Sequence, residues 1–156
     1  MPGPILSPPH GYMEIVLGEA AEAALREEVP VAALVVDPEA REILALASNR
    51  TEELKDATAH AELLALQEVA KIYGGTRLFG CDLYVTLEPC TMCAAAISLA
   101  RIRRLYFAAP DPKGGGVEHG PKIFDQPTCH HRPEIYGGID EIRAGRILRD
   151  FFQARR

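Results

Sequence analysis

The chain has 156 residues, of which 47% are hydrophobic and 25% are charged, as is usual for a globular protein. A chain of this length can bury one hydrophobic core, so we expect a single domain over residues 1–156. No apolar run approaches the roughly 20 residues of a membrane helix, and the first residues do not resemble a signal peptide. With only 4 cysteines, we expect a cytoplasmic protein with no membrane partner, because cytosolic thiols stay reduced.

The net charge of −5 is unevenly distributed along the chain. Residues 1–100 hold 6 Lys or Arg and 15 Asp or Glu, a net −9, whereas residues 101–156 hold 11 and 7, a net +4. Local positive charge attracts anionic partners more than the total charge predicts. The bias indicates either ordinary solvated faces or a basic C-terminal half that contacts phosphates.

The first third of the chain predicts a loop, a helix and a hairpin. Residues 1–10 hold four prolines and read as a loop-like N-terminal extension. Apolar residues at helical spacing predict an amphipathic helix over residues 11–27. The continuous apolar run at 31–36 predicts a buried strand, and 43–48 a second strand that pairs with it as a hairpin.

The remainder alternates between helices and strands. Thr58 is a candidate N-cap for a helix that ends near Gly74 and Gly75. Residues 110–133 are rich in proline and glycine and predict a long loop. The other expected elements are strands at 81–86, 104–108 and 134–136, a helix at 91–99, and a final helix from about residue 142. This alternation predicts an α/β fold with helices on both faces of the sheet.

Two short motifs carry the chemistry. Cys90 and Cys93 form a C-x-x-C pair after Pro89, where a strand is expected to lead into a helix. Residues three apart share a helix face, and a helix N-terminus favours thiolate over thiol. His60 and Glu62 lie thirty residues upstream, also at the expected start of a helix.

One histidine and two cysteines are ligands that zinc prefers. Three protein ligands leave a fourth position open for water, which distinguishes a catalytic zinc site from a structural one. Zinc lowers the pKa of a water molecule that it binds, and Glu62 would be the nearby carboxylate that handles protons. Three alternatives stay open on the residues alone. The cysteines could form a redox dithiol, the zinc site could be closed by Cys81, Cys129 or a histidine, and His60 could be merely structural.

The order H-x-E followed by P-C-x-x-C is the signature of zinc-dependent nucleobase deaminases. The likeness extends over about residues 11–156, where the chain resembles bacterial tRNA-specific adenosine deaminases of the cytidine/deoxycytidylate deaminase superfamily. The runs that carry it are Glu28-Val29-Pro30-Val31, Ser48-Asn49-Arg50, Thr58-Ala59-His60-Ala61-Glu62, the segment 83–93, Ala109-Pro110-Asp111-Pro112-Lys113 and Asp150-Phe151-Phe152.

This resemblance implies a fold, a reaction and a partner. The fold would be a three-layer sandwich in which helices cover both faces of a mixed five-stranded sheet. The protein would be a homodimer that converts adenosine to inosine at the wobble position of a tRNA anticodon, with the anticodon stem-loop as its partner. It would bind one zinc ion per chain and need no organic cofactor.

The resemblance also assigns roles to single residues. His60, Cys90 and Cys93 would hold the zinc ion, and Glu62 would move protons. Asn49 would hydrogen-bond the target base, although it could equally be a turn residue that ends a strand. Asp111 would lie on the loop that faces the nucleic acid, or would be an ordinary aspartate of a surface turn.

Several departures put the substrate in question. Glu118 adds negative charge where RNA would approach, and His130 stands where the family pattern suggests asparagine. An enzyme of the same superfamily that acts on a free base such as guanine is therefore an alternative. A non-catalytic RNA-binding protein with a structural zinc ion is another, which the presence of Glu62 disfavours. Basic residues near the C-terminus favour RNA: Arg143, Arg146, Arg149, Arg155 and Arg156.

Overall fold

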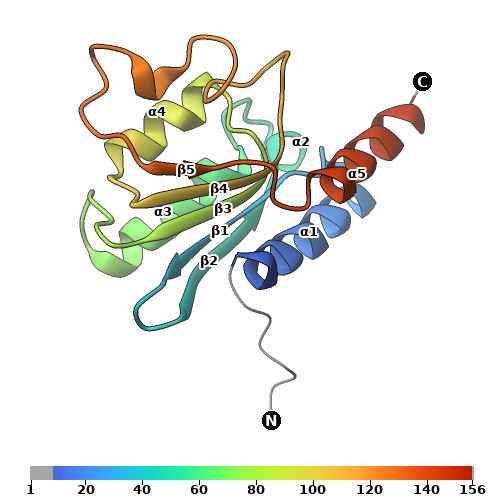
Figure 1. Ribbon diagram of the computed structural model, residues 1–156. Helices are drawn as coiled ribbons and strands as arrows, with labels where there is room; N and C mark the ends of the chain where they lie inside the picture. Colours follow the sequence, from blue (N-terminus) through green and yellow to red (C-terminus); the bar gives the residue numbers. More distant parts are fainter. Residues whose placement is uncertain (1–8, 156) are drawn as a thin grey trace.

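A mixed five-stranded sheet organises the chain (Figure 1). The computed structural model describes residues 9–155. The strands are β1 (Ala32–Asp37), β2 (Glu42–Ser48), β3 (Asp82–Leu87), β4 (Arg104–Ala109) and β5 (Glu134–Tyr136), in the order β2-β1-β3-β4-β5. Strand β1 runs antiparallel to both β2 and β3, whereas β3, β4 and β5 are parallel to one another. The predicted hairpin and the predicted mixed sheet are both confirmed.

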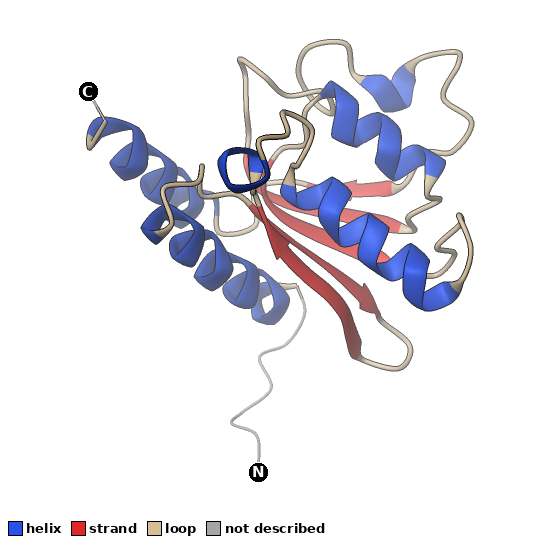
Figure 2. Ribbon diagram, turned by 180° about the vertical axis from the view of Figure 1, so that it is seen from behind, coloured by secondary structure: helices blue, strands red, loops and turns tan. Residues whose placement is uncertain are grey.

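Helices cover both faces of this sheet (Figure 2). Helices α3 (Ala61–Tyr73) and α4 (Thr91–Leu99) lie on one face, and α1 (His10–Leu25) and α5 (Glu141–Gln153) lie on the other. Two short elements, α2 (Thr51–Leu54) and the 3-10 helix η1 (Ile123–Asp125), sit in the connections. The predicted three-layer α/β arrangement is therefore confirmed. Within residues 9–155, no helix combines the length and the apolar character that a membrane span requires.

Alternation along the strands divides the core into two halves. On β1, Ala33 and Val35 pack with the cluster under α3 and α4, whereas Leu34 and Val36 pack with the cluster under α1 and α5. Successive strand residues point to opposite faces, so a strand covered on both sides must be apolar throughout. This explains why the sequence reads as one continuous apolar run there.

The connection from β3 to β4 places the cysteine pair. Parallel neighbours require a crossover, and helix α4 supplies it. The chain leaves the carboxyl end of the central strand β3 and enters α4 within a few residues, so Cys90 and Cys93 lie beyond that end, where α4 begins. The strand-to-helix junction predicted for this pair is confirmed.

Four local expectations need correction. The prediction of a loop-like extension over residues 1–10 falls mostly on residues 1–8, which lie outside the described part of the chain. Helix α1 already begins at His10. Thr58 does not cap α3, because its hydroxyl donates to Asp56 in a local turn and His60 occupies the N-cap. The long connection contains η1. On α5, Ile142 and Phe152 are exposed rather than part of the buried face.

Candidate functional site

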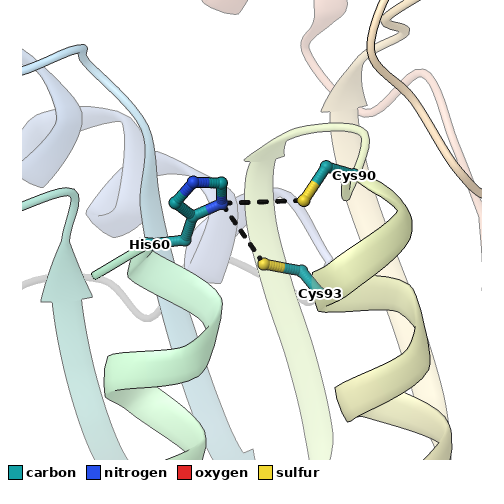
Figure 3. Close-up of side chains that lie close together, drawn as sticks. All are labelled: His60, Cys90 and Cys93. Carbon is teal, nitrogen blue, oxygen red and sulfur yellow. Dashed lines mark hydrogen bonds between the residues drawn. The ribbon is translucent and has the colours of Figure 1, made fainter. Parts of the chain in front are cut away.

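Two helix N-termini bring a histidine and two cysteines together (Figure 3). His60 is the N-cap of α3 and Cys90 is the N-cap of α4, both with extended backbone, and Cys93 lies in the first turn of α4. The Nδ1 atom of His60 lies 3.6 Å from Sγ of Cys90 and 3.5 Å from Sγ of Cys93. All three ligand atoms lie within 4.8 Å of one another.

This donor set fits a zinc ion, because zinc binds imidazole nitrogen and thiolate sulfur in structural and catalytic sites alike. Among residues 9–155, no other group of His, Cys, Asp and Glu side chains converges in this way. The alternative of a site closed by Cys81 or Cys129 does not form. The Cys81 thiol hydrogen-bonds the Tyr73 hydroxyl, and Cys129 lies beside Ser98.

The two thiols titrate as a pair. A hydrogen bond from Cys93 lowers the pKa of Cys90 to about 5, against the opposing effect of burial and with help from His60. The same hydrogen bond and burial raise the pKa of Cys93. The protein groups alone therefore favour one thiolate at neutral pH, and a bound metal ion would displace the second proton.

Glu62 lies in the first turn of α3 with 4% of its surface exposed. Burial, with a smaller contribution from the negative charge of Cys90, outweighs the opposing effects of the backbone and His60 and raises the pKa of Glu62 to about 7. A carboxyl group with this pKa can both accept and release a proton near neutral pH. That property suits a general acid and base more than a permanent counter-ion.

A pocket of about 270 Å³ opens beside the cluster. It is lined by five of the six residues that the sequence singled out, and the sixth, Cys93, is fully buried. The five are Asn49, His60, Glu62, Cys90 and Asp111. The structure therefore brings the predicted site residues to one place, although they come from four different connections or helix ends.

Asn49 and Asp111 both line the pocket from connections that follow a strand. Asn49 directly follows β2, and its amide nitrogen lies 3.1 Å from the Thr51 hydroxyl while its side chain lines the pocket. Asp111 accepts hydrogen bonds from the backbone of Lys113 and Gly114 in its own turn, and it also lines the pocket. Both residues therefore lie at the pocket, and their roles in substrate binding stay predictions.

Two buried carboxylates beside the pocket were missed by the sequence analysis. The Glu28 carboxylate accepts a hydrogen bond from the Asn49 amide at 3.4 Å. It also accepts hydrogen bonds from the backbone N–H groups of Glu52 and Glu53 at the start of α2. Glu88, two residues before Cys90, is also fully buried. Each of the two residues adjoins an apolar segment and precedes a proline by one or two positions, but this local pattern does not indicate a buried carboxylate, because the partners lie 21 to 31 residues away.

A family model and two sequence relatives all identify the chain as a member of a deaminase family. Residues 7–109 match the family model described as the cytidine and deoxycytidylate deaminase zinc-binding region. The chain is 55% identical over 146 residues to a tRNA-specific adenosine deaminase of Agrobacterium fabrum, covering 93% of this chain and 94% of that one. It is 44% identical over 146 residues to the tRNA-specific adenosine deaminase of Aquifex aeolicus, again covering 93% and 94%.

Solved structures agree with the sequence relatives. A structure from work on A-to-I editing by tRNA:A34 deaminases at the wobble position of transfer RNA matches with a TM-score of 0.85 at 54% identity. The match covers 88% of this chain and 98% of that one. A guanine deaminase of Nitrosomonas europaea matches with a TM-score of 0.80 at 23% identity, covering 95% and 86%, which is a likeness of fold alone. The fold predicted from the resemblance is therefore confirmed.

Proposed function

The chain belongs to the tRNA-specific adenosine deaminases, within the cytidine and deoxycytidylate deaminase family, and we propose that it converts adenosine to inosine at the wobble position of a tRNA anticodon. It is a zinc-dependent enzyme that catalyses a hydrolytic deamination. The observation that carries the proposal is the pocket, in which the His-Cys-Cys cluster and the buried carboxyl group of Glu62 lie together. We take residues 1–156 as one catalytic domain.

His60, Cys90 and Cys93 would hold one zinc ion per chain. A bound zinc ion supplies Lewis acidity, which makes a water molecule a competent nucleophile near neutral pH. His60 and Cys90 also line the pocket, so a substrate in the pocket would reach the metal-binding side chains directly.

Glu62 would then manage the protons of the reaction. It accepts a proton from water as the oxygen adds to C6 of adenine, and it delivers that proton to ring nitrogen N1. The proton of the new C6 hydroxyl then moves through Glu62 to the amine, which leaves as ammonia and gives inosine. One carboxyl group serves first as base and then as acid, which matches a pKa of about 7.

Asn49 and Asp111, which lie in two different connections, would bind the substrate nucleotide. The carboxylate of Glu28 and the hydroxyl of Thr51 hold the amide of Asn49, so its orientation is fixed before a base arrives. Fixed orientation lowers the entropy that binding must overcome. Asp111 holds its own turn and would contact the nucleotides that flank the target base.

The RNA partner would be the anticodon stem-loop. The target base must leave the stack of the loop, which costs a few kcal/mol, so contacts with neighbouring phosphates must offset this cost. Helix α5 carries two exposed arginines, Arg146 and Arg149, which form no ion pair with any residue of the described chain. A tRNA substrate and four free cysteines favour a cytoplasmic location.

The assembly would be a homodimer through helix α4. Leu99 on this helix is 70% exposed, and beside it lies a pocket of about 210 Å³ with a mainly apolar lining that includes Ala95 and Ile123. An exposed apolar surface of this kind is typical of an interface. Light scattering at micromolar concentration tests the proposal, and a mass of 17.0 kDa would mean a monomer.

The two alternatives that the sequence left open are less well supported. The guanine deaminase shares the fold at 23% identity, whereas the tRNA-specific relatives reach 55% over nearly the whole chain. A non-catalytic RNA-binding protein would have no need of a buried Glu62 beside the metal ligands.

A direct assay separates these functions. The purified protein is incubated with a tRNA transcript that has adenosine at the first anticodon position, and in parallel with free guanine. We expect inosine in the tRNA together with one ammonia per inosine, and no ammonia from guanine. Ammonia from guanine without inosine in tRNA would establish the free-base alternative.

A further inference from the structure

The carboxylate of Glu88 has no part in the chemistry described above, yet Glu88 lines the same pocket as His60, Glu62 and Cys90. It follows strand β3, two residues before Cys90, and its side chain is fully buried. Burying a charged group is costly unless hydrogen bonds replace its water. The hydrogen-bond partners of the Glu88 carboxylate therefore indicate its role.

One loop supplies all of these partners. Oε1 of Glu88 accepts from the backbone N–H of Asp111 at 3.0 Å and lies 2.7 Å from Nδ1 of His119. Oε2 accepts from the backbone N–H groups of Val117, Glu118 and His119 at 3.2, 2.9 and 3.1 Å. Residues 111–119 thus wrap their backbone amides around a single carboxylate, as loops elsewhere wrap around a bound anion. These hydrogen bonds hold the pKa of Glu88 below its usual value, although burial alone would raise it.

Glycine makes this close approach possible. A Cβ atom on Gly115 would lie 2.3 Å from Oε2 of Glu88, so no other residue fits there without moving the loop. Gly115 also forms an isolated antiparallel bridge with Cys90, and the backbone N–H of Gly116 donates to the Pro89 carbonyl at 2.8 Å. The loop is therefore attached both to the carboxylate and to the backbone of a proposed metal ligand.

The first part of this loop forms one wall of the pocket. Asp111 and Gly114 line the pocket together with Asn49, and the backbone N–H of Asp111 donates to Glu88. The loop N–H groups that bind Glu88 lie 23 to 31 residues after it in the sequence, so this wall is held by a contact between distant parts of the chain. If the carboxylate were lost, the backbone N–H groups of Asp111, Val117, Glu118 and His119 would lose the acceptor that they share, and the loop would keep only its turn at Asp111 and its contacts with Pro89 and Cys90.

We propose that Glu88 is a positioning residue for the deamination, which holds loop 111–119 against the start of α4 and thereby fixes the pocket wall that receives the RNA. The inference rests on the proposed function, because it concerns the same pocket. It predicts an effect on substrate binding and little effect on zinc content or on proton transfer by Glu62.

The test uses Glu88→Gln, which keeps the shape of the side chain but replaces one acceptor oxygen by an NH₂ group that faces backbone N–H donors. The second variant, Gly115→Ala, leaves Glu88 intact and pushes the loop away from it. Matched controls are Glu134→Gln on the exposed edge strand and Gly75→Ala, whose added Cβ would meet nothing within 4 Å. Each protein is assayed for zinc, for KM and kcat on the tRNA transcript, and for trypsin cleavage after Lys113 and Lys122, which are both exposed.

We expect KM to rise about tenfold or more in both variants while kcat stays within about threefold, because a mispositioned wall weakens binding more than chemistry. Zinc should be retained, and trypsin should cleave the loop faster than in the parent and the controls. Parental KM and parental cleavage would overturn the proposal, as would loss of zinc or a fall in kcat alone. If Glu88→Gln does not fold, Gly115→Ala decides. If the parent itself makes no inosine in tRNA, the proposed function fails. The trypsin cleavage rates would still test whether Glu88 keeps loop 111–119 in place.

Discussion

Metal binding at this site depends on two helix N-termini that meet, so a single ligand change should abolish it. Replacing Cys90 by alanine leaves one imidazole and one thiol, too few ligands for a tight zinc site. We expect the zinc content of Cys90→Ala to fall from about one ion per chain to a small fraction of that, as measured by elemental analysis after dialysis. Cys129→Ala removes a half-buried thiol elsewhere and should retain its zinc. Full zinc occupancy in Cys90→Ala would contradict this ligand set.

A Glu62 variant can test the proton chemistry separately from metal binding, because Glu62 is not one of the proposed zinc ligands. In Glu62→Gln the side chain keeps its size but can no longer accept and release a proton. We expect kcat on tRNA to fall by about a hundredfold or more, the usual contribution of general acid–base catalysis, with normal zinc content and an unchanged circular dichroism spectrum. Glu68→Gln on the exposed side of the same helix is the matched control. Turnover within a few-fold of the parent would remove Glu62 from this role.

Residues of the site differ in how far the sequence alone could predict them. His60, Glu62, Cys90 and Cys93 belong to short motifs in which spacing itself indicates a shared face or helix end. Glu28 does not, because its partners are the Asn49 amide and the backbone N–H groups of Glu52 and Glu53, which lie 21 to 25 residues away and form no local motif with it. Glu88 shares this property, with partners up to 31 residues away.

Among the elements, apolar runs, helical spacing and the positions of turn residues were together sufficient to indicate the five strands and the four long helices. It could not predict α2, which has 4 residues and no buried side chain. Helices of this length do not form on propensity alone, because nucleation costs more than a few hydrogen bonds return. Here Glu28 accepts from the backbone N–H groups of Glu52 and Glu53, so a distant side chain supplies the stabilisation.

This dependence gives a prediction for α2. In Glu28→Gln, one carboxylate oxygen is replaced by a donor that faces other donors. We expect the free energy of unfolding to fall by about 1–3 kcal/mol, the range for hydrogen bonds to charged groups and buried groups left without a partner. Urea denaturation measures it, and Glu22→Gln on the exposed face of α1 is the control. An unfolding midpoint equal to that of the parent would show that α2 does not depend on Glu28.

At the scale of the whole molecule, α1 and α5 run side by side in the same direction on one face of the sheet (Figure 1). Ion pairs join them at both ends, from Arg143 to Glu14 and from Arg155 to Glu27. Arg155 also stacks on the Phe151 ring at 3.4 Å. The sequence could show that residues 101–156 are basic but not which arginines are already paired, since these partners are 128 and 129 residues apart.

Arg146 and Arg149 are therefore the arginines of α5 that we expect to contact phosphate. Each phosphate contact releases counterions from RNA, so log affinity falls linearly with log salt concentration. Neutralising both, in Arg146→Gln/Arg149→Gln, should weaken tRNA binding at low salt and flatten that slope by about 1.4 to 1.8, the share of two contacts. Filter binding between roughly 50 and 200 mM salt measures the slope. The control, Arg41→Gln/Arg77→Gln, loses the same charge from exposed positions in the β1–β2 turn and in the connection that precedes β3, and should keep the parental slope, because neither residue lines the pocket. Equal slopes in all three proteins would mean that RNA binds elsewhere, whereas an equal loss in both variants would mean that only the total charge matters.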